Sequence, residues 1–325
     1  MLYSISDDGK TAVKKVENIN AYLVAAADVI VKPLAKPIDD RPDFISGNVA
    51  DDDGQLIVDS IQEFGLIPET CRHLVRPFVG SFELINGKKR YCIWVEDEDL
   101  ELAKSIDEFA KRFDKVRKKR SSPAAGPRAK EAVDTPHQFA FRSNRDARAL
   151  VIPRVSSEGR PFLPIDLIEG RTIIGDRNFA LYDADLWNMA LIASRLHWVW
   201  IGTVCVRLEM RFSYSNTLGW NTFPVPLLTE QNKADLTRCA EDILLAREAH
   251  FPATIADLYD PETMPDNLRH AHERNDEVLE RIYIGRRFKN DTERLEKLFE
   301  LYTKMTAVDK AKPAVKATRG RKKTV

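Results

Sequence analysis

The sequence predicts an α+β fold, in which a mixed α/β region of short strands is followed by a helical C-terminal module. Short apolar runs bounded by Gly and Pro indicate strands before residue 226, and capping residues indicate helices after residue 227. Pro224 and Pro226 separate the two regions. The chain has 325 residues, of which 43% are hydrophobic, so it can bury the cores that this fold needs.

The strands follow from short apolar segments between turn residues. The first 17 residues predict a hairpin of Leu2–Ile5 and Ala12–Val16 around Asp7-Asp8-Gly9. Asn86-Gly87 is typical of a second hairpin turn. Further strands are expected at Val29–Val31, Arg90–Val95, Ala149–Ile152, Phe162–Ile165, Thr172–Ile174 and Phe179–Tyr182.

The helices follow from periodicity and from capping residues. Apolar residues spaced by three or four from Leu100 to Arg120 predict a basic amphipathic helix, followed by a loop at 121–128. Other helices are expected at Asp185–Arg207, from Thr229 to about His250, at Asp266–Tyr283 and at Asp291–Met305. The segment after Ala307 lacks apolar periodicity and is expected to be disordered.

Charge is balanced over the chain but uneven along it. The chain holds 50 Lys and Arg residues against 50 Asp and Glu residues. Nine basic residues lie between Lys111 and Lys130, and seven between Val308 and Val325. Such segments suit a polyanion, because each neutralised phosphate releases a counterion. The alternative is a solvated helix face and a solubilising tail.

Several classes of function are disfavoured by missing motifs. The four cysteines are widely spaced, and the histidines show no ligand spacing on one helix face, so neither a metal site nor a disulfide framework is expected. Asp51-Asp52-Asp53 indicates a turn rather than a magnesium site. No apolar stretch reaches the roughly 20 residues of a membrane span, so a cytoplasmic protein without membrane contact is expected.

Methyl transfer to adenine would need two motifs that the sequence does not contain. The first is a Pro-Pro tetrapeptide that holds the flipped base, and the second is a Gly-rich turn that admits S-adenosylmethionine. We therefore expect no catalytic residue, no cofactor and no metal in this chain.

Several strings in fixed order nevertheless resemble one known family, and the resemblance runs from Asn18 nearly to the C-terminus. The strings are Asn18–Leu23, Arg76–Ser81, Ile85–Trp94, Thr135–Phe139, Ile152–Arg160, Tyr214–Ser215, Asn221–Pro224, Ala256–Asp260, Thr263–Pro265 and Leu268–Arg269. They are similar to the MmeI-like family of fused restriction endonuclease and N6-adenine methyltransferase proteins, in the region after the methyltransferase domain. Gly159, Trp220 and Val225 depart from the commoner pattern, as expected if the segment reads a different DNA sequence.

The resemblance implies sequence-specific recognition of double-stranded DNA. It implies a trailing methyltransferase segment at 1–24, a DNA target-recognition domain at 25–226, a helical C-terminal module at 227–306 and a disordered basic tail at 307–325. The expected partner is an adenine-specific methyltransferase domain or subunit, which would bind S-adenosylmethionine. The chain is then a fragment or a separate specificity subunit, and the alternative is a non-specific nucleic-acid-binding or scaffold protein.

The residues of one short segment suit base reading. Arginine pairs with guanine through two hydrogen bonds, glutamate accepts from the cytosine amino group, and serine bonds either way. We expect base contacts from Arg154, Ser156, Ser157, Glu158 and Arg160. The alternative from the residues alone is a surface β-turn with incidental charges.

Two further groups of residues suit the DNA backbone, because phosphate contacts come from basic, hydroxyl, amide and aromatic donors. The first group ends the basic helix and the second lies in an aromatic, polar segment. They are Arg117, Lys118, Lys119 and Arg120, and then Arg207, Arg211, Tyr214, Ser215 and Asn221. The alternative for the second group is an exposed loop packed on its own tryptophan.

Overall fold

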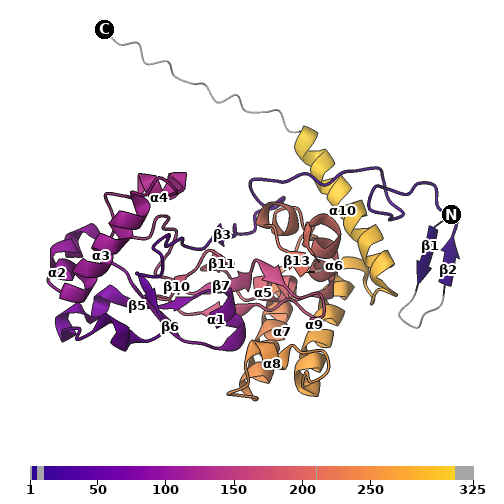
Figure 1. Ribbon diagram of the computed structural model, residues 1–325. Helices are drawn as coiled ribbons and strands as arrows, with labels where there is room; N and C mark the ends of the chain where they lie inside the picture. The colour runs from indigo at the N-terminus through magenta and orange to yellow at the C-terminus, as the bar shows by residue number, and fades with distance from the viewer. Residues whose placement is uncertain (1, 6–10, 210, 312–325) are drawn as a thin grey trace, which may run out of the picture.

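Short sheets lie beside a layer of long C-terminal helices in this chain, as Figure 1 shows. The computed structural model describes residues 2–5, 11–209 and 211–311. The predicted α+β class is confirmed, because mixed strands and helices before residue 227 give way to helices alone among the described residues after it.

The N-terminal hairpin is confirmed as an antiparallel pair. It consists of β1 (Leu2–Ile5) and β2 (Thr11–Lys14), and Leu2 lies opposite Lys14. Its predicted turn at Asp7-Asp8-Gly9 falls outside the described residues.

The first four-stranded sheet has the order β10-β5-β6-β4. Its strands are β4 (Ile57–Val58), β5 (Val75–Val79), β6 (Arg90–Ile93) and β10 (Ile173–Ile174). The hairpin predicted at Asn86-Gly87 is wrong, because helix α1 (Ser81–Asn86) follows β5 and Gly87 ends that helix. Gly87 has φ 61°, so the left-handed conformation that suggested a hairpin serves a helix end instead.

The basic helix expected at Leu100–Arg120 is two helices. They are α2 (Leu100–Lys104) and α3 (Asp107–Arg120), separated where Ile106 has an extended backbone. Phe109, Phe113 and Val116 of α3 are buried in the same core as the first sheet. The expected loop at 121–128 ends in a short helix, α4 (Pro127–Glu131), and three 3-10 helices complete this region: η1 (Ile61–Phe64), η2 (Glu69–Leu74) and η3 (Asp97–Asp99).

The second four-stranded sheet has the order β3-β11-β7-β9 and pairs its neighbours antiparallel. Its strands are β3 (Ile45–Ser46), β7 (Ala149–Pro153), β9 (Asp166–Ile168) and β11 (Asn178–Tyr182). The strands predicted at Val29–Val31 and Phe162–Ile165 are wrong. Val31 and Phe162 are buried against other side chains without a partner strand. Their apolar runs therefore indicate burial in the core and not pairing in a β-sheet.

Helices from residue 187 onward pack with the second sheet in the larger of the hydrophobic cores. The segment expected as one helix at Asp185–Arg207 is divided by Ser194, whose hydroxyl accepts from the backbone N–H of His197 and starts the second helix. Thr229 starts α7 by accepting from the N–H of Asn232, as predicted. The helices are α5 (Trp187–Ile192), α6 (Arg195–Val204), η4 (Asn216–Trp220), α7 (Glu230–Glu248), α8 (Ile255–Leu258), α9 (Asp266–Ile284) and α10 (Asp291–Ala311).

One hydrophobic cluster joins the second sheet to these helices. It contains Leu150 of β7, Trp200 of α6 and Leu279 of α9. Helix α10 continues past the expected start of the tail at residue 307, and 312–325 lie outside the described residues. Among the described helices, none is long and apolar enough to cross a membrane.

Candidate nucleic-acid interface

A third, small sheet brings together the two polar segments that the sequence separates by about fifty residues. It contains β8 (Val155–Ser156), β12 (Arg207–Leu208) and β13 (Arg211–Ser213) in the order β12-β13-β8. Phe212 lies opposite Ser156, and the N–H of Tyr214 donates to the carbonyl of Arg154 at 2.8 Å. The segment of the expected base readers and part of the second group expected at the DNA backbone are therefore joined by one small sheet.

A tight turn follows β8 and carries Glu158, one of the two exposed residues among the expected base readers. The N–H of Arg160 donates to the carbonyl of Ser157 at 3.3 Å, and the N–H of Gly159 donates to the Ser157 hydroxyl at 3.3 Å. These bonds close the chain on itself, so Glu158 lies exposed at the tip. Ser157 is half-buried and already accepts within the turn.

Arg160 is a half-buried cation that pairs with no carboxylate among the described residues. Burial lowers the pKa of its guanidinium. An unpaired and partly desolvated guanidinium is costly, and the cost is relieved by an acceptor such as a base edge or a phosphate.

Arg154 precedes this turn and is exposed. Its guanidinium lies 4.9 Å from the centre of the Phe179 ring and donates to the carbonyl of Asp176 at 3.3 Å. Both contacts hold the side chain against the end of the second sheet.

The structure contradicts the prediction that Ser156 contacts a base. This residue is 3% exposed, because it faces buried Phe212 on the inner side of the small sheet. A base edge would reach it only after this sheet had moved, so its small polar side chain is part of the packing.

The second backbone group is divided between surface and core. Arg207 and Arg211 are exposed on the hairpin of β12 and β13, where Arg207 lies 4.6 Å from the Phe212 ring centre and Arg211 pairs with Glu209 at 2.8 Å. Ser215 is half-buried and accepts from the N–H of Leu218 at 3.3 Å, which starts the η4 turn.

The prediction that Tyr214 and Asn221 contact the DNA backbone is contradicted, because both side chains are buried. The Tyr214 hydroxyl lies 3.0 Å from His197 Nε2, and burial lowers the pKa of His197 to about 3. The Asn221 amide donates to the carbonyl of Leu34 at 2.8 Å. These hydrogen bonds lie inside the core, so neither side chain faces solvent.

The end of α3 is divided in the same way. Arg117 and Lys118 are exposed, and Lys119 is half-buried and pairs with Asp51 at 2.7 Å. The prediction that Arg120 contacts the DNA backbone is contradicted, because its side chain is fully buried. Its guanidinium donates to five protein carbonyls at 2.7–3.2 Å. Those carbonyls belong to Ala50, Asp51, Ala132, Thr135 and Gln138.

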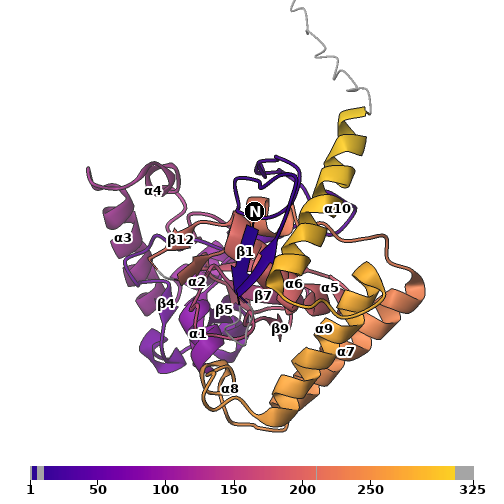
Figure 2. The ribbon, with the colours of Figure 1, turned by 90° about the vertical axis from the view of Figure 1, so that its right-hand side faces the viewer.

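The end of α3 and the small sheet lie apart: in Figure 1, α3 is toward the left and β13 lies beside α6. In Figure 2, α3, α4 and β12 lie toward the left, whereas α7 and α9 lie toward the right.

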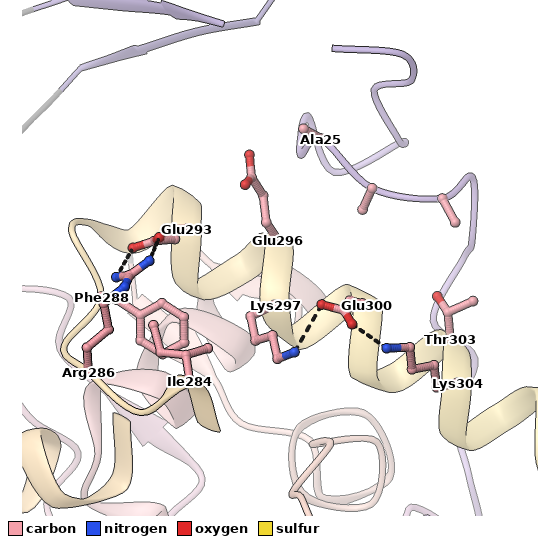
Figure 3. Close-up of a pocket in the computed structure, with 12 residues that line it drawn as sticks. Ala25, Ile284, Arg286, Phe288, Glu293, Glu296, Lys297, Glu300, Thr303 and Lys304 are labelled. Carbon is pink, nitrogen blue, oxygen red and sulfur yellow. Dashed lines mark hydrogen bonds and ion pairs between the residues drawn. The ribbon is translucent and has the colours of Figure 1, made fainter. Parts of the chain in front are cut away.

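A cavity of about 630 Å³ lies elsewhere, between residues 25–27 and α10 (Figure 3). Its charged side chains form ion pairs: Arg286 with Glu293, and Glu300 with both Lys297 and Lys304. Because these cations already have partners, we assign no anion to this cavity. Within the described part of the chain, no cluster of His, Cys, Asp and Glu could hold a metal ion, and the four cysteines are free.

Comparison with known proteins identifies the chain. A family model for the MmeI target recognition domain matches residues 25–227, and one for the MmeI C-terminal domain matches residues 228–308. The chain is thus of the target-recognition class. It belongs to the MmeI family, and the resemblance seen in the sequence is confirmed. The predicted domain limits at 24, 226 and 306 remain predictions.

Two relatives show how much of a longer protein this chain resembles. DNA methyltransferase A of Bacillus subtilis (strain 168) is 35% identical over 299 residues, which are 90% of this chain and 33% of that protein. A solved structure of the Type IIL restriction-modification enzyme MmeI in complex with DNA has 31% identity and a TM-score of 0.84, covering 92% of this chain and 40% of that one. The chain spans about a third of the length of the curated relative.

Proposed function

We propose that this chain recognises a specific sequence in double-stranded DNA for an adenine-N6 methyltransferase of a restriction-modification system. The observation that carries the proposal is the turn after β8 in a member of the MmeI target recognition family. There an exposed carboxylate, Glu158, lies two residues from Arg160, whose half-buried guanidinium pairs with no carboxylate in the part of the chain that the structure describes.

The two side chains have complementary preferences for bases. A glutamate accepts from the cytosine amino group, and an arginine donates to guanine O6 and N7. On one short turn they would meet neighbouring positions of the major groove. Ser157 is a weaker candidate for a base contact, since its hydroxyl already accepts within the turn.

Contacts to the DNA backbone would come from exposed cations on two separate elements. Arg207 and Arg211 lie on the same small sheet, and Arg117 and Lys118 lie at the end of α3. Lys119 and Ser215 would contribute less, because each is half-buried and already has a partner.

The methyl transfer itself would belong to a methyltransferase domain or subunit that binds S-adenosylmethionine. This part of the proposal is supported by the relative named as a DNA methyltransferase, of which the chain covers 33%. It predicts that adding such a catalytic domain to the purified chain yields methylation at the site that the chain selects.

The test is a selection of binding sites from randomised duplex DNA with the wild type, Glu158→Lys and Arg160→Asp. Each variant should change the preferred base at one position, because each contact contributes about 1–3 kcal/mol to discrimination against the wrong base. Glu169→Lys is the matched control, because it makes the same charge change at an exposed position outside the turn. If both variants keep the wild-type sequence and lose only affinity, Glu158 and Arg160 are not the base readers.

A competition assay separates specific recognition from the alternative of a non-specific binder or scaffold. Sequence readers typically prefer their site over unrelated duplex by roughly 1,000-fold or more. A wild-type chain that binds the selected duplex and an unrelated duplex equally well would refute the proposed function.

A further inference from the structure

Arg177 is a candidate DNA contact that the sequence analysis did not single out. It lies in the turn between β10 and β11, and its side chain is exposed. Its carbonyl accepts from the N–H of Arg154 at 2.8 Å. The turn therefore adjoins the chain that leads into the proposed base-reading turn.

The register of the strands places these two arginines opposite each other. Pro153 on β7 pairs with Asn178 on β11, so the next antiparallel pair is Arg154 with Arg177. Residues directly opposite in an antiparallel ladder project to the same face, with Cβ atoms roughly 5 Å apart. Both guanidinium groups therefore start from one face at one end of the second sheet.

The backbone that carries Arg177 is held on several sides. The Asn178 side chain is fully buried and donates to the carbonyl of Val79 at 3.1 Å. The Ser81 hydroxyl at the start of α1 donates to the carbonyl of Arg177. A Cβ on Gly175 would lie 2.6 Å from the Phe78 ring, so this turn is packed too closely to shift easily.

Neither arginine has a carboxylate partner among the described residues. Arg154 is held by the Phe179 ring and the carbonyl of Asp176, neither of which carries a negative charge. Like charges directly opposite in a ladder are destabilising, so the free protein carries a cost that an anion would remove. A phosphodiester suits this position, because its oxygens accept from guanidinium groups in a charge-assisted way.

We propose that Arg154 and Arg177 together bind one phosphodiester of the DNA backbone beside the bases contacted by the turn at Glu158 and Arg160. This inference rests on the proposed function, and it moves Arg154 from base reading to backbone binding. The pair then sets the position of the base-reading turn on the duplex and carries no sequence information itself.

The test measures DNA affinity over a series of salt concentrations, with the selected duplex and an unrelated duplex, for the wild type, Arg177→Ala and Arg154→Ala. Each variant should lose affinity for both duplexes by a similar factor, and the slope of log K against log salt should fall by up to about 0.9, the value for one phosphate. Arg281→Ala is the matched control, because it removes an exposed arginine from α9, toward the right in Figure 2, and it should leave affinity and slope unchanged.

A second measurement reports on the free protein. Because Arg177→Ala removes one of two opposed like charges, its unfolding free energy in urea should equal or exceed that of the wild type. A fall in stability would show that Arg177 supports the fold, and would overturn the inference.

Two binding outcomes would also overturn it: unchanged affinity and slope in Arg177→Ala, or a changed preferred base in either arginine variant. Failure of the proposed function gives a different pattern. A wild type that does not discriminate between the duplexes refutes sequence recognition, whereas an equal loss in Arg177→Ala still supports the phosphate contact.

Discussion

Gly47 lies so close to the backbone of Gly175 that it has no room for a larger residue. A Cβ on Gly47 would lie 2.2 Å from the carbonyl oxygen of Gly175, and one on Gly175 would lie 2.6 Å from the Phe78 ring. Beside this contact, the N–H of Asn48 donates to the carbonyl of Ile174 at 2.7 Å. The two four-stranded sheets meet here, because β3 and β11 belong to one and β10 to the other.

Gly47→Ala should therefore destabilise the protein, by about 1–3 kcal/mol or more, because backbone and not a flexible side chain would have to shift. The unfolding free energy in urea checks this. Gly170→Ala is the control, since its new Cβ would be at an ordinary 3.5 Å from its nearest neighbours and should change stability by under about 1 kcal/mol. Equal stability of the two variants would contradict the argument.

Arg120→Lys should unfold more easily than the wild type, by on the order of 3 kcal/mol, because one ammonium cannot replace a guanidinium that donates to five carbonyls. Arg117→Lys, at an exposed position on the same helix, should stay within about 0.5 kcal/mol. Urea unfolding measures both variants. An Arg120→Lys protein of wild-type stability that had lost DNA affinity would instead restore Arg120 as a DNA contact.

Acid should destabilise the protein through two buried histidines. Burial lowers the pKa of His197 and of His272 to about 3, against about 6.5 in an unfolded chain. The unfolded state thus binds more protons between these values, so stability is present above pH 6.5 and is lost as the pH falls toward 3. Each histidine contributes a slope of up to roughly 1.4 kcal/mol per pH unit.

Urea unfolding between pH 5 and 7.5 measures this slope, and His272→Asn should reduce it. His270→Asn is the control, because it makes the same substitution at an exposed position on the same helix. If His272→Asn has the slope of the wild type, His272 is not buried in its neutral form.

Asp276 should make the unfolding free energy depend on pH in the opposite direction to the two histidines. Burial raises its pKa to about 7, against about 3.9 when unfolded, so the folded state holds this proton more tightly. Its contribution is fully present below pH 3.9 and is lost as the pH rises through 7. Asp276→Asn removes this contribution and can still accept from the N–H of Arg195, a bond of 2.7 Å. Its loss of stability between pH 7 and 5 should be steeper than that of the wild type, and a shallower loss would refute the sign.

Local patterns predicted those elements whose signal lies within one segment. The apolar runs of β7 and β11 and the Thr229 start of α7 were found where the sequence placed them. Patterns failed where a second segment decides the outcome. Phe162 and Val31 have the apolar character of strand residues, yet strand formation needs a partner with free N–H and C=O groups, and none lies beside them among the described residues.

The sequence by itself determined the family and the α+β class, because ordered strings and local periodicity carry that information. The base contacts expected from Arg154 to Arg160 remain a prediction. Only the tertiary structure decided which polar residues are free to meet DNA. A guanidinium binds carbonyls as readily as phosphates, so the burial of Arg120 depends on distant loops that pack around it. The opposition of Arg154 and Arg177 likewise depends on the register of β7 with β11, which long-range packing sets.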